Sequence, residues 1–295
     1  MTEMVYHKKD TNLLVLPSVE NVDEIVKGIS SKIKFTKGKF DKIQYIFKGT
    51  DVQMLHAGID LREFSSVWLL SFWRSREQAF AVKLYLDHFG IQHTYIEKAT
   101  SKITDQVMFA VNGILAPDTF FADISRIEDH VEKIEEVCGY PLIIKDTKGS
   151  RGKYSAFIEN RDELLSIFEE FPKYKRYIFQ KFIPNEFDWG VLVSNGEVVS
   201  AEKSYPANEE FRNNACNGAK ETFVPVEDIP QRIKDIAIKA SNILGLSWSR
   251  ADIIIDKNTG EPYLLEVNRC PGVSSGTSEV TGAQQFLKAH LASIA

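Results

Sequence analysis

The sequence has few cysteines, and none of them is placed to form a cross-link. The three cysteines, Cys138, Cys216 and Cys270, are far apart, and no Cys-x-x-Cys pair occurs. A disulfide framework or a cysteine zinc site needs an even or closely spaced set. The composition therefore predicts a protein of a reducing compartment that folds without a disulfide scaffold.

Long apolar runs and excess positive charge are also missing. No stretch approaches the roughly 18 continuous apolar residues of a membrane span, and residues 1–10 have no apolar segment typical of a secretion signal. The 36 lysines and arginines are outnumbered by 41 aspartates and glutamates, which leaves a net charge of −5. A broad nucleic-acid-binding surface needs the opposite balance. These absences predict a soluble cytoplasmic protein that binds neither nucleic acid nor membrane.

Two common nucleotide-binding fingerprints are absent as well. The chain contains neither a GxxxxGK[ST] loop nor a GxGxxG turn. It does have an ordinary globular composition, with 43% hydrophobic and 26% charged residues over 295 positions. Because this length exceeds one average domain, we expect two compact units or three small subdomains that share a cleft.

The first hundred residues show the periodicity of a small α/β domain. Apolar residues at helical spacing predict a helix over 18–29, and lysines alternating with apolar residues predict a strand pair over 32–47 with one solvated face. A buried strand at 67–70 precedes a helical pattern at 79–89, an order that favours parallel strand pairing.

The remainder of the chain alternates between hairpins and helices. The pattern predicts a hairpin over 142–159, a strand over 177–183 and a hairpin that turns at Asn195-Gly196. A long helix is expected to end near Gly245, and an antiparallel pair, 251–256 with 262–268, closes the pattern.

Oxygen-bearing side chains gather on that last strand pair. Asp252 lies on the first strand, and Glu266 and Asn268 lie two residues apart on the second, so that the pleat directs both of the latter to one face, where all three can converge. Carboxylate and amide oxygens suit Mg²⁺, which keeps positions for water and phosphate oxygens. The alternative is a solvated strand edge on which carboxylates happen to alternate.

A second candidate is the glycine-rich segment 148–153 inside the first of these hairpins. Its backbone N–H groups could surround phosphates while Arg151 and Lys153 neutralise charge, although an ordinary basic hairpin would have the same composition. Lys145 ends the apolar strand before it. A lysine that is half buried there needs an anionic partner, which predicts a nearby phosphate.

The order of these pieces resembles the ATP-grasp superfamily, in particular its RimK-like branch. The resemblance covers about 100–290, and residues 60–70 resemble the small α/β domain that precedes it. It is carried by the local matches Ser101-Lys102 with Gly113 to Thr119, Pro141 to Lys145 with Gly149 to Gly152, Phe211 to Asn214, and Leu265 to Gly272.

The resemblance implies an ATP-grasp fold of the α/β (α+β) class. A small N-terminal α/β domain, 1–100, would precede two α+β subdomains that clasp ATP, a central or lid subdomain at 101–183 and a metal-binding one at 184–295.

The resemblance also implies roles for single residues around ATP. Lys102 and Lys145 look like the lysines that contact the phosphates. The lid would be formed by Gly149, Ser150, Arg151, Gly152 and Lys153. The adenine would be held by Gln180, Lys181, Phe182 and Ile183, with Lys181 and Ile183 acting through backbone groups. Asp188 would face the ribose or the edge of the nucleotide.

At the reacting end the resemblance implies a metal site and an acyl-phosphate site. Asp252, Glu266 and Asn268 match magnesium ligands, with Glu266 bridging two ions and Mn²⁺ as an alternative ion. Arg212 and Asn214 match residues that face the phosphates or the acyl phosphate.

One stretch departs from the pattern of the branch. Asp188-Trp189-Gly190 stands where Asp-Ile-Arg is common, so an arginine is missing. Lys203 or Arg250 could supply a replacement cation, although a surface lysine and a structural arginine are the simpler interpretations.

The activity implied is an ADP-forming carbon–nitrogen ligation. A carboxylate would attack the γ-phosphate of ATP, and an amine would capture the resulting acyl phosphate to give an amide or peptide bond. The substrate is expected to be an amino acid, a peptide or a protein tail. A non-catalytic ATP-binding module and a kinase-like phosphoryl transfer remain as alternatives, and the sequence leaves both substrates and the oligomeric state open.

Overall fold

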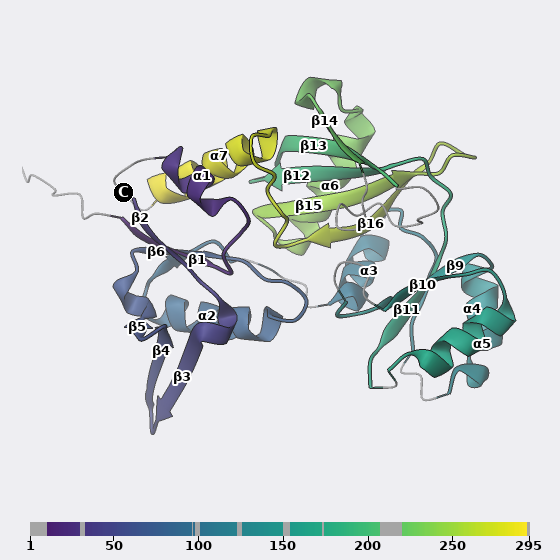
Figure 1. The fold of residues 1–295 in the computed structure, drawn as a ribbon, viewed down its shortest axis with the longest axis horizontal. Helices are drawn as coiled ribbons and strands as arrows, with labels where there is room; N and C mark the ends of the chain where they lie inside the picture. The colour runs from purple at the N-terminus through teal and green to yellow at the C-terminus, as the bar shows by residue number, and fades with distance from the viewer. Residues whose placement is uncertain are drawn as a thin grey trace, which may run out of the picture. The chain divides into compact units, whose positions relative to one another are not determined.

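The computed structural model describes residues 11–29, 33–95, 97, 101–122, 126–149, 154–172, 174–206 and 220–293 (Figure 1). The chain divides into two units, Met1–Ile96 with Arg269–Ala295, and Glu97–Asn268. The C-terminal segment thus belongs to the unit that contains the N-terminus, while the three-part division at 100 and 183 stays a prediction. None of the helices in these described ranges combines the length and apolar character that a membrane span requires.

The first unit is built around a four-stranded parallel sheet. Its strand order is β2 (Lys34–Lys37), β1 (Asn12–Leu16), β6 (Ser66–Leu69) and β7 (Gln92–His93). Its helices are α1 (Val22–Lys27), α2 (Arg76–His88) and α7 (Ser278–Ala292). Alternate residues of β1 and β6 share one core with α2, and Trp68 of β6 contacts Phe286 of α7, with ring centroids 5.8 Å apart. The parallel pairing predicted from the β-α order is confirmed.

A separate antiparallel sheet shows that the predicted strand pair over 32–47 is wrong. It consists of β3 (Ile43–Lys48), β4 (Asp51–His56) and β5 (Ile59–Asp60), so β3 pairs with β4, whereas β2 pairs with β1. A short 3₁₀ turn, Phe40–Lys42, separates β2 from β3, and Phe40 enters the core there. The lysines of this stretch that the structure describes are nevertheless exposed, as expected for a solvated face.

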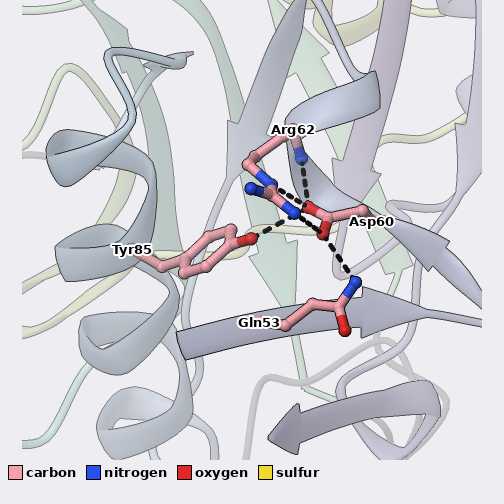
Figure 2. Close-up of polar contacts among 4 residues, drawn as sticks. All are labelled: Gln53, Asp60, Arg62 and Tyr85. Atoms are coloured by element: carbon pink, nitrogen blue, oxygen red, sulfur yellow. Dashed lines mark hydrogen bonds and ion pairs between the residues drawn. The ribbon is translucent and has the colours of Figure 1, made fainter. Parts of the chain in front are cut away.

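Asp60 ties three elements of this unit together, as Figure 2 shows. Its carboxylate accepts hydrogen bonds from Arg62 Nη2 at 2.7 Å, Tyr85 Oη at 2.9 Å and Gln53 Nε2 at 3.1 Å. It also accepts from the Arg62 backbone N–H at 2.9 Å and so caps the 3₁₀ turn Leu61–Glu63. Burial would raise the pKa of Asp60, but these hydrogen bonds outweigh burial and hold the pKa well below its usual value.

The second unit begins with helix α3 (Lys102–Val111) and a four-stranded antiparallel sheet. The strand order is β10 (Ser155–Ile158), β9 (Leu142–Asp146), β11 (Tyr177–Lys181) and β8 (Thr119–Phe120). Helices α4 (Val131–Cys138) and α5 (Arg161–Glu170) cover one face (Figure 1) and share a core with Leu142, Ile144 and Phe179. Because strand side chains alternate, Lys145 and Gln180 lie on the other face.

The second sheet of this unit has five antiparallel strands. Their order is β14 (Lys220–Val224), β13 (Glu197–Tyr205), β12 (Asp188–Ser194), β15 (Trp248–Ile255) and β16 (Pro262–Asn268). Helix α6 (Gln231–Leu244) buries its apolar residues against Val191, Ala251 and Val267, and α3 packs against α6. This packing leaves the intervening residues of the strands, which include the acidic ones, on the face away from α6.

Candidate nucleotide and metal site

Two carboxylates and an amide meet on the face of the five-stranded sheet opposite α6. Asp252 on β15 is directly across from Glu266 on β16, and Arg250 is across from Asn268. Asn268 Nδ2 donates a hydrogen bond of 2.8 Å to Asp252 Oδ2. The structure thus brings together the three side chains that the sequence predicts to converge.

The electrostatics of this cluster favour a cation. Burial raises the pKa of Asp252 well above its usual value, the charge of Glu266 raises it further, and Arg250 opposes the rise. A bound divalent ion would offset both the cost of burying the Asp252 carboxylate and its repulsion from Glu266. In the part of the chain that the structure describes, no three His, Cys, Asp or Glu side chains form a metal cluster, so the donor set is two carboxylates and an amide. Such a set fits Mg²⁺, which retains water and phosphate oxygens as ligands.

Two lysines approach the carboxylates from different elements. Lys102 lies in the first turn of α3, where Ser101 Oγ accepts a 3.2 Å hydrogen bond from the Thr104 backbone N–H and fixes the start of the helix. Lys102 Nζ is 2.9 Å from Glu266 Oε2. The capped helix end therefore places an ammonium group directly on a candidate metal ligand.

Lys145 is the second lysine, and it comes from β9. Its Nζ donates a 2.8 Å hydrogen bond to Gln180 Oε1, and Gln180 Nε2 in turn donates to Thr119 Oγ1 at 3.1 Å. Burial and the charge of Lys102 lower the pKa of Lys145 to about 8, against the opposing effect of Glu266 and the other carboxylates nearby. A half-buried lysine held on a neutral amide is well prepared to accept an anion.

The end of β11 supplies the candidate adenine segment. Gln180 and Ile183 are buried, and the ring of Phe182 packs edge-on against Phe157 with centroids 4.9 Å apart. The backbone N–H of Lys181 donates to Asp118 O at 2.9 Å, and that of Phe182 donates to the Pro141 carbonyl at 3.1 Å. Lys181 would therefore meet a base through its carbonyl oxygen. The adenine role of this segment stays a prediction.

Asp188 lies near the carboxylate cluster, whereas Lys203 points away from it. Asp188 begins β12, accepts a 2.8 Å hydrogen bond from Asn185 Nδ2, and contributes to the negative field at Asp252 and Lys145. The ammonium of Lys203 lies over the rings of Phe187 and Trp189, 4.5 Å and 4.9 Å from their centroids. Trp189 belongs to the core beneath α6, so Lys203 points away from the carboxylates. Of the two proposed replacement cations, only Arg250 lies on their face.

The lid and acyl-phosphate residues are mostly outside the described residues. Gly149 is described, and its N–H donates to Asp146 O at 3.1 Å. The others are Ser150, Arg151, Gly152, Lys153, Arg212 and Asn214, whose roles stay predictions.

Sequence reasoning missed Glu202, a buried carboxylate on β13. Its Oε1 is 3.2 Å from Nη1 of Arg250, and its side chain is 3% exposed. It lies directly over Gly190, where a Cβ atom would be 2.1 Å from Glu202 Oε1. The available signal was an acidic residue on the same side of the strand as Ser200 and Ser204, which are small and buried.

Comparison with known proteins identifies the family. The model of the RimK-like ATP-grasp domain matches residues 99–289. The chain belongs to the RimK-like ATP-grasp family. This membership confirms the resemblance seen in the sequence.

Curated relatives of this chain carry the name "Probable alpha-L-glutamate ligase". The protein of that name from Syntrophotalea carbinolica is 32% identical over 190 residues, which are 63% of this chain and 60% of the relative. The one from Aliivibrio fischeri is 30% identical with the same shares of the two chains. The match thus spans about 60% of the length of these relatives.

Solved structures show the same fold over nearly the whole chain. The ATP-grasp ligase PsnB with a minimal precursor superposes with a TM-score of 0.67 at 18% identity and covers 96% of this chain and 99% of its own. D-alanine–D-alanine ligase from Bacillus anthracis with ATP gives a TM-score of 0.68 at 16% identity, with 96% and 98% covered. The predicted ATP-grasp fold is confirmed.

Proposed function

We propose that this RimK-like protein is an ATP-dependent carboxylate–amine ligase that forms an amide or peptide bond and releases ADP. The observation that carries the proposal is the convergence of Asp252, Glu266 and Asn268 with Lys102 and Lys145. Buried carboxylates whose mutual repulsion disfavours ionisation are costly unless a cation is bound between them, which supports a metal-dependent site.

The proposed amino acid substrate is L-glutamate. The curated relatives are named as ligases of that amino acid, and PsnB has been solved with a precursor peptide. We therefore propose a carboxylate and an amine drawn from glutamate and from a second amino acid, a peptide or a protein tail.

The proposed chemistry has two steps that share one site. An oxygen of the substrate carboxylate attacks the γ-phosphorus of ATP and ADP departs, and the amine nitrogen then attacks the acyl carbon while phosphate departs. Lys102 and Lys145 would offset the charge of the phosphates and of the approaching carboxylate, which otherwise repel each other. Asp252, Glu266 and Asn268 would hold the divalent metal. Bound Mg²⁺ supplies further charge neutralisation at the phosphate oxygens.

The test is incubation with Mg-ATP and L-glutamate, with and without pooled amino acids and peptides, followed by assay of ADP and mass spectrometry. We expect ADP release together with a condensed product. Nucleotide binding without turnover would support the binding module, and a stable phosphorylated product would support a kinase.

A substitution of a proposed metal ligand tests the site itself. Glu266→Gln keeps the shape of the side chain but removes the charge, so kcat should fall by at least about 100-fold while the melting temperature holds. Glu197→Gln, in an exposed position on β13 of the same sheet, is the matched control and should keep full activity. Normal turnover by Glu266→Gln would contradict the proposed site.

A further inference from the structure

A buried ion pair lies beside the proposed metal ligands, in the place where the family arginine is missing. Glu202 on β13 is 3% exposed, and Arg250 on β15, 16% exposed, approaches it at 3.2 Å. The two strands flank β12, on which Gly190 lies directly between Glu202 and Asp252 in the strand register.

The absence of a side chain at Gly190 leaves space for the Glu202 carboxylate. A Cβ atom at position 190 would be 2.1 Å from Oε1 of Glu202 and 2.7 Å from its carboxyl carbon, far inside van der Waals contact. Because Gly190 has no side chain, Glu202 can lie over β12 and reach Arg250. An arginine at position 190 and the Glu202 carboxylate would need the same volume.

The two residues of this ion pair differ in burial, which suits Arg250 for binding a ligand. The carboxylate of Glu202 is the more deeply buried partner, and burying it is tolerable only while a cation faces it. Arg250 is less buried and stands two residues before Asp252 on the same face of the strand. A guanidinium group is planar, always charged and shaped to bind carboxylates, so its orientation decides what it recognises.

We propose that Glu202 is a positioning residue that holds Arg250 over the metal-bearing face, where Arg250 binds the carboxylate of the substrate. Arg250 on β15 thereby takes the place of an arginine on β12, and Gly190 is required because Glu202 fills its side-chain space. This inference rests on the proposed ligase function, since it names the group that binds the substrate in that site.

Calorimetry separates this role from a structural one. We would measure the Kd of Mg-AMPPNP, and then the Kd of L-glutamate in its presence, for the wild type, Glu202→Gln, Arg250→Gln and the double variant. Glu202→Gln should weaken L-glutamate binding about tenfold or more and leave the Kd of Mg-AMPPNP within about twofold. The double variant should bind L-glutamate no more than about twofold more weakly than Arg250→Gln alone, because the two substitutions disrupt the same interaction. Glu202→Asp should recover part of the affinity.

Gly190 provides a second, independent test. Gly190→Ala should lower both the melting temperature and the affinity for L-glutamate, because the new Cβ displaces Glu202. Glu202→Ala alone should lower the melting temperature, because Arg250 loses its buried partner. Adding Gly190→Ala to Glu202→Ala should lower the melting temperature no further, and the affinity should stay low. Wild-type affinity in this double variant would show that Glu202 only fills space and would overturn the inference.

Failure of the inference and failure of the proposed function give different results. A wild type that binds Mg-AMPPNP and L-glutamate but releases no ADP with any amine refutes the ligase. A wild type that releases ADP while Glu202→Gln keeps its Kd for L-glutamate within twofold refutes the inference, as does a wild type that does not bind L-glutamate.

Discussion

Through the proposed contact of Lys145 with the phosphates, nucleotide binding should depend on pH in a range where most lysines do not titrate. Burial and the nearby Lys102 lower the pKa of Lys145 to about 8, and its Nζ is held on Gln180 Oε1 at 2.8 Å. The protonated form carries the charge that a triphosphate needs. Affinity for Mg-AMPPNP should therefore be high below pH 8 and fall as the pH rises through that value.

The size of the effect follows from the pKa. If only the charged lysine binds, its population falls from roughly 0.9 at pH 7 to roughly 0.1 at pH 9, so affinity falls about tenfold, or about 1.4 kcal/mol. Calorimetry at the two pH values measures this ratio directly. Binding near pH 8 should also take up protons, which appears as a dependence of the enthalpy on the buffer used.

Lys145→Arg is the decisive control, because a guanidinium group stays charged over the whole range. Its affinity should vary by less than about twofold between pH 7 and pH 9. If this variant lost affinity as steeply as the wild type, the titrating group would lie elsewhere and the assignment of Lys145 to the phosphates would be wrong.

Two further predictions concern the stability of the two units. Asp60→Asn should cost about 2 kcal/mol at pH 7, because the buried Tyr85 hydroxyl loses a charged acceptor. The folded pKa of Asp60 lies well below its unfolded value, so this contribution is present above about pH 4 and is lost only as the pH falls toward the much lower folded pKa. Equal penalties in urea unfolding at pH 7 and at about pH 2 would contradict this reasoning. Asn160→Ala removes the side-chain cap on the Glu163 N–H, 3.0 Å long, and should cost about 1 kcal/mol. Asn160→Ser, which keeps an acceptor and adds no charge beside the Glu163 carboxylate, should cost less in the same measurement.

Local signals predicted the elements that position the site. Asn195 and Gly196 take positive φ angles of 48° and 83° in the hairpin between β12 and β13, and α6 ends at Gly245 with φ 68°. Such residues specify backbone conformation without help from distant contacts. The strand period likewise placed Glu266 and Asn268 on one face, because a two-residue repeat needs no knowledge of the rest of the fold. The position of Asp252 opposite Glu266 depends on the register between β15 and β16.

Pairing between strands was harder to predict. The alternation over 32–47 identifies two strands correctly but carries no information about their neighbours, and β2 joins the parallel sheet through β1 while β3 pairs with β4. The backbone N–H of Gly38 donates to Val15 O at 2.8 Å, which holds the end of β2 against β1. Parallel partners are distant in sequence, so a local pattern favours the nearest antiparallel partner and misses the correct one.

The arrangement of Gly190, Glu202 and Arg250 shows why a missing motif residue is a poor guide to a missing function. Read alone, the glycine looks like the loss of a substrate contact, the buried glutamate looks costly and the arginine looks structural. In the sheet each explains the others, because the glycine admits the carboxylate and the carboxylate holds the guanidinium beside Asp252. A cationic side chain can lie in such a site wherever there is space for it and an acidic partner to hold it. A neighbouring strand can therefore supply the cation, as β15 does here in place of β12. A RimK-like sequence with glycine at this position should therefore be searched for a paired acid and arginine on the two flanking strands before its site is judged incomplete.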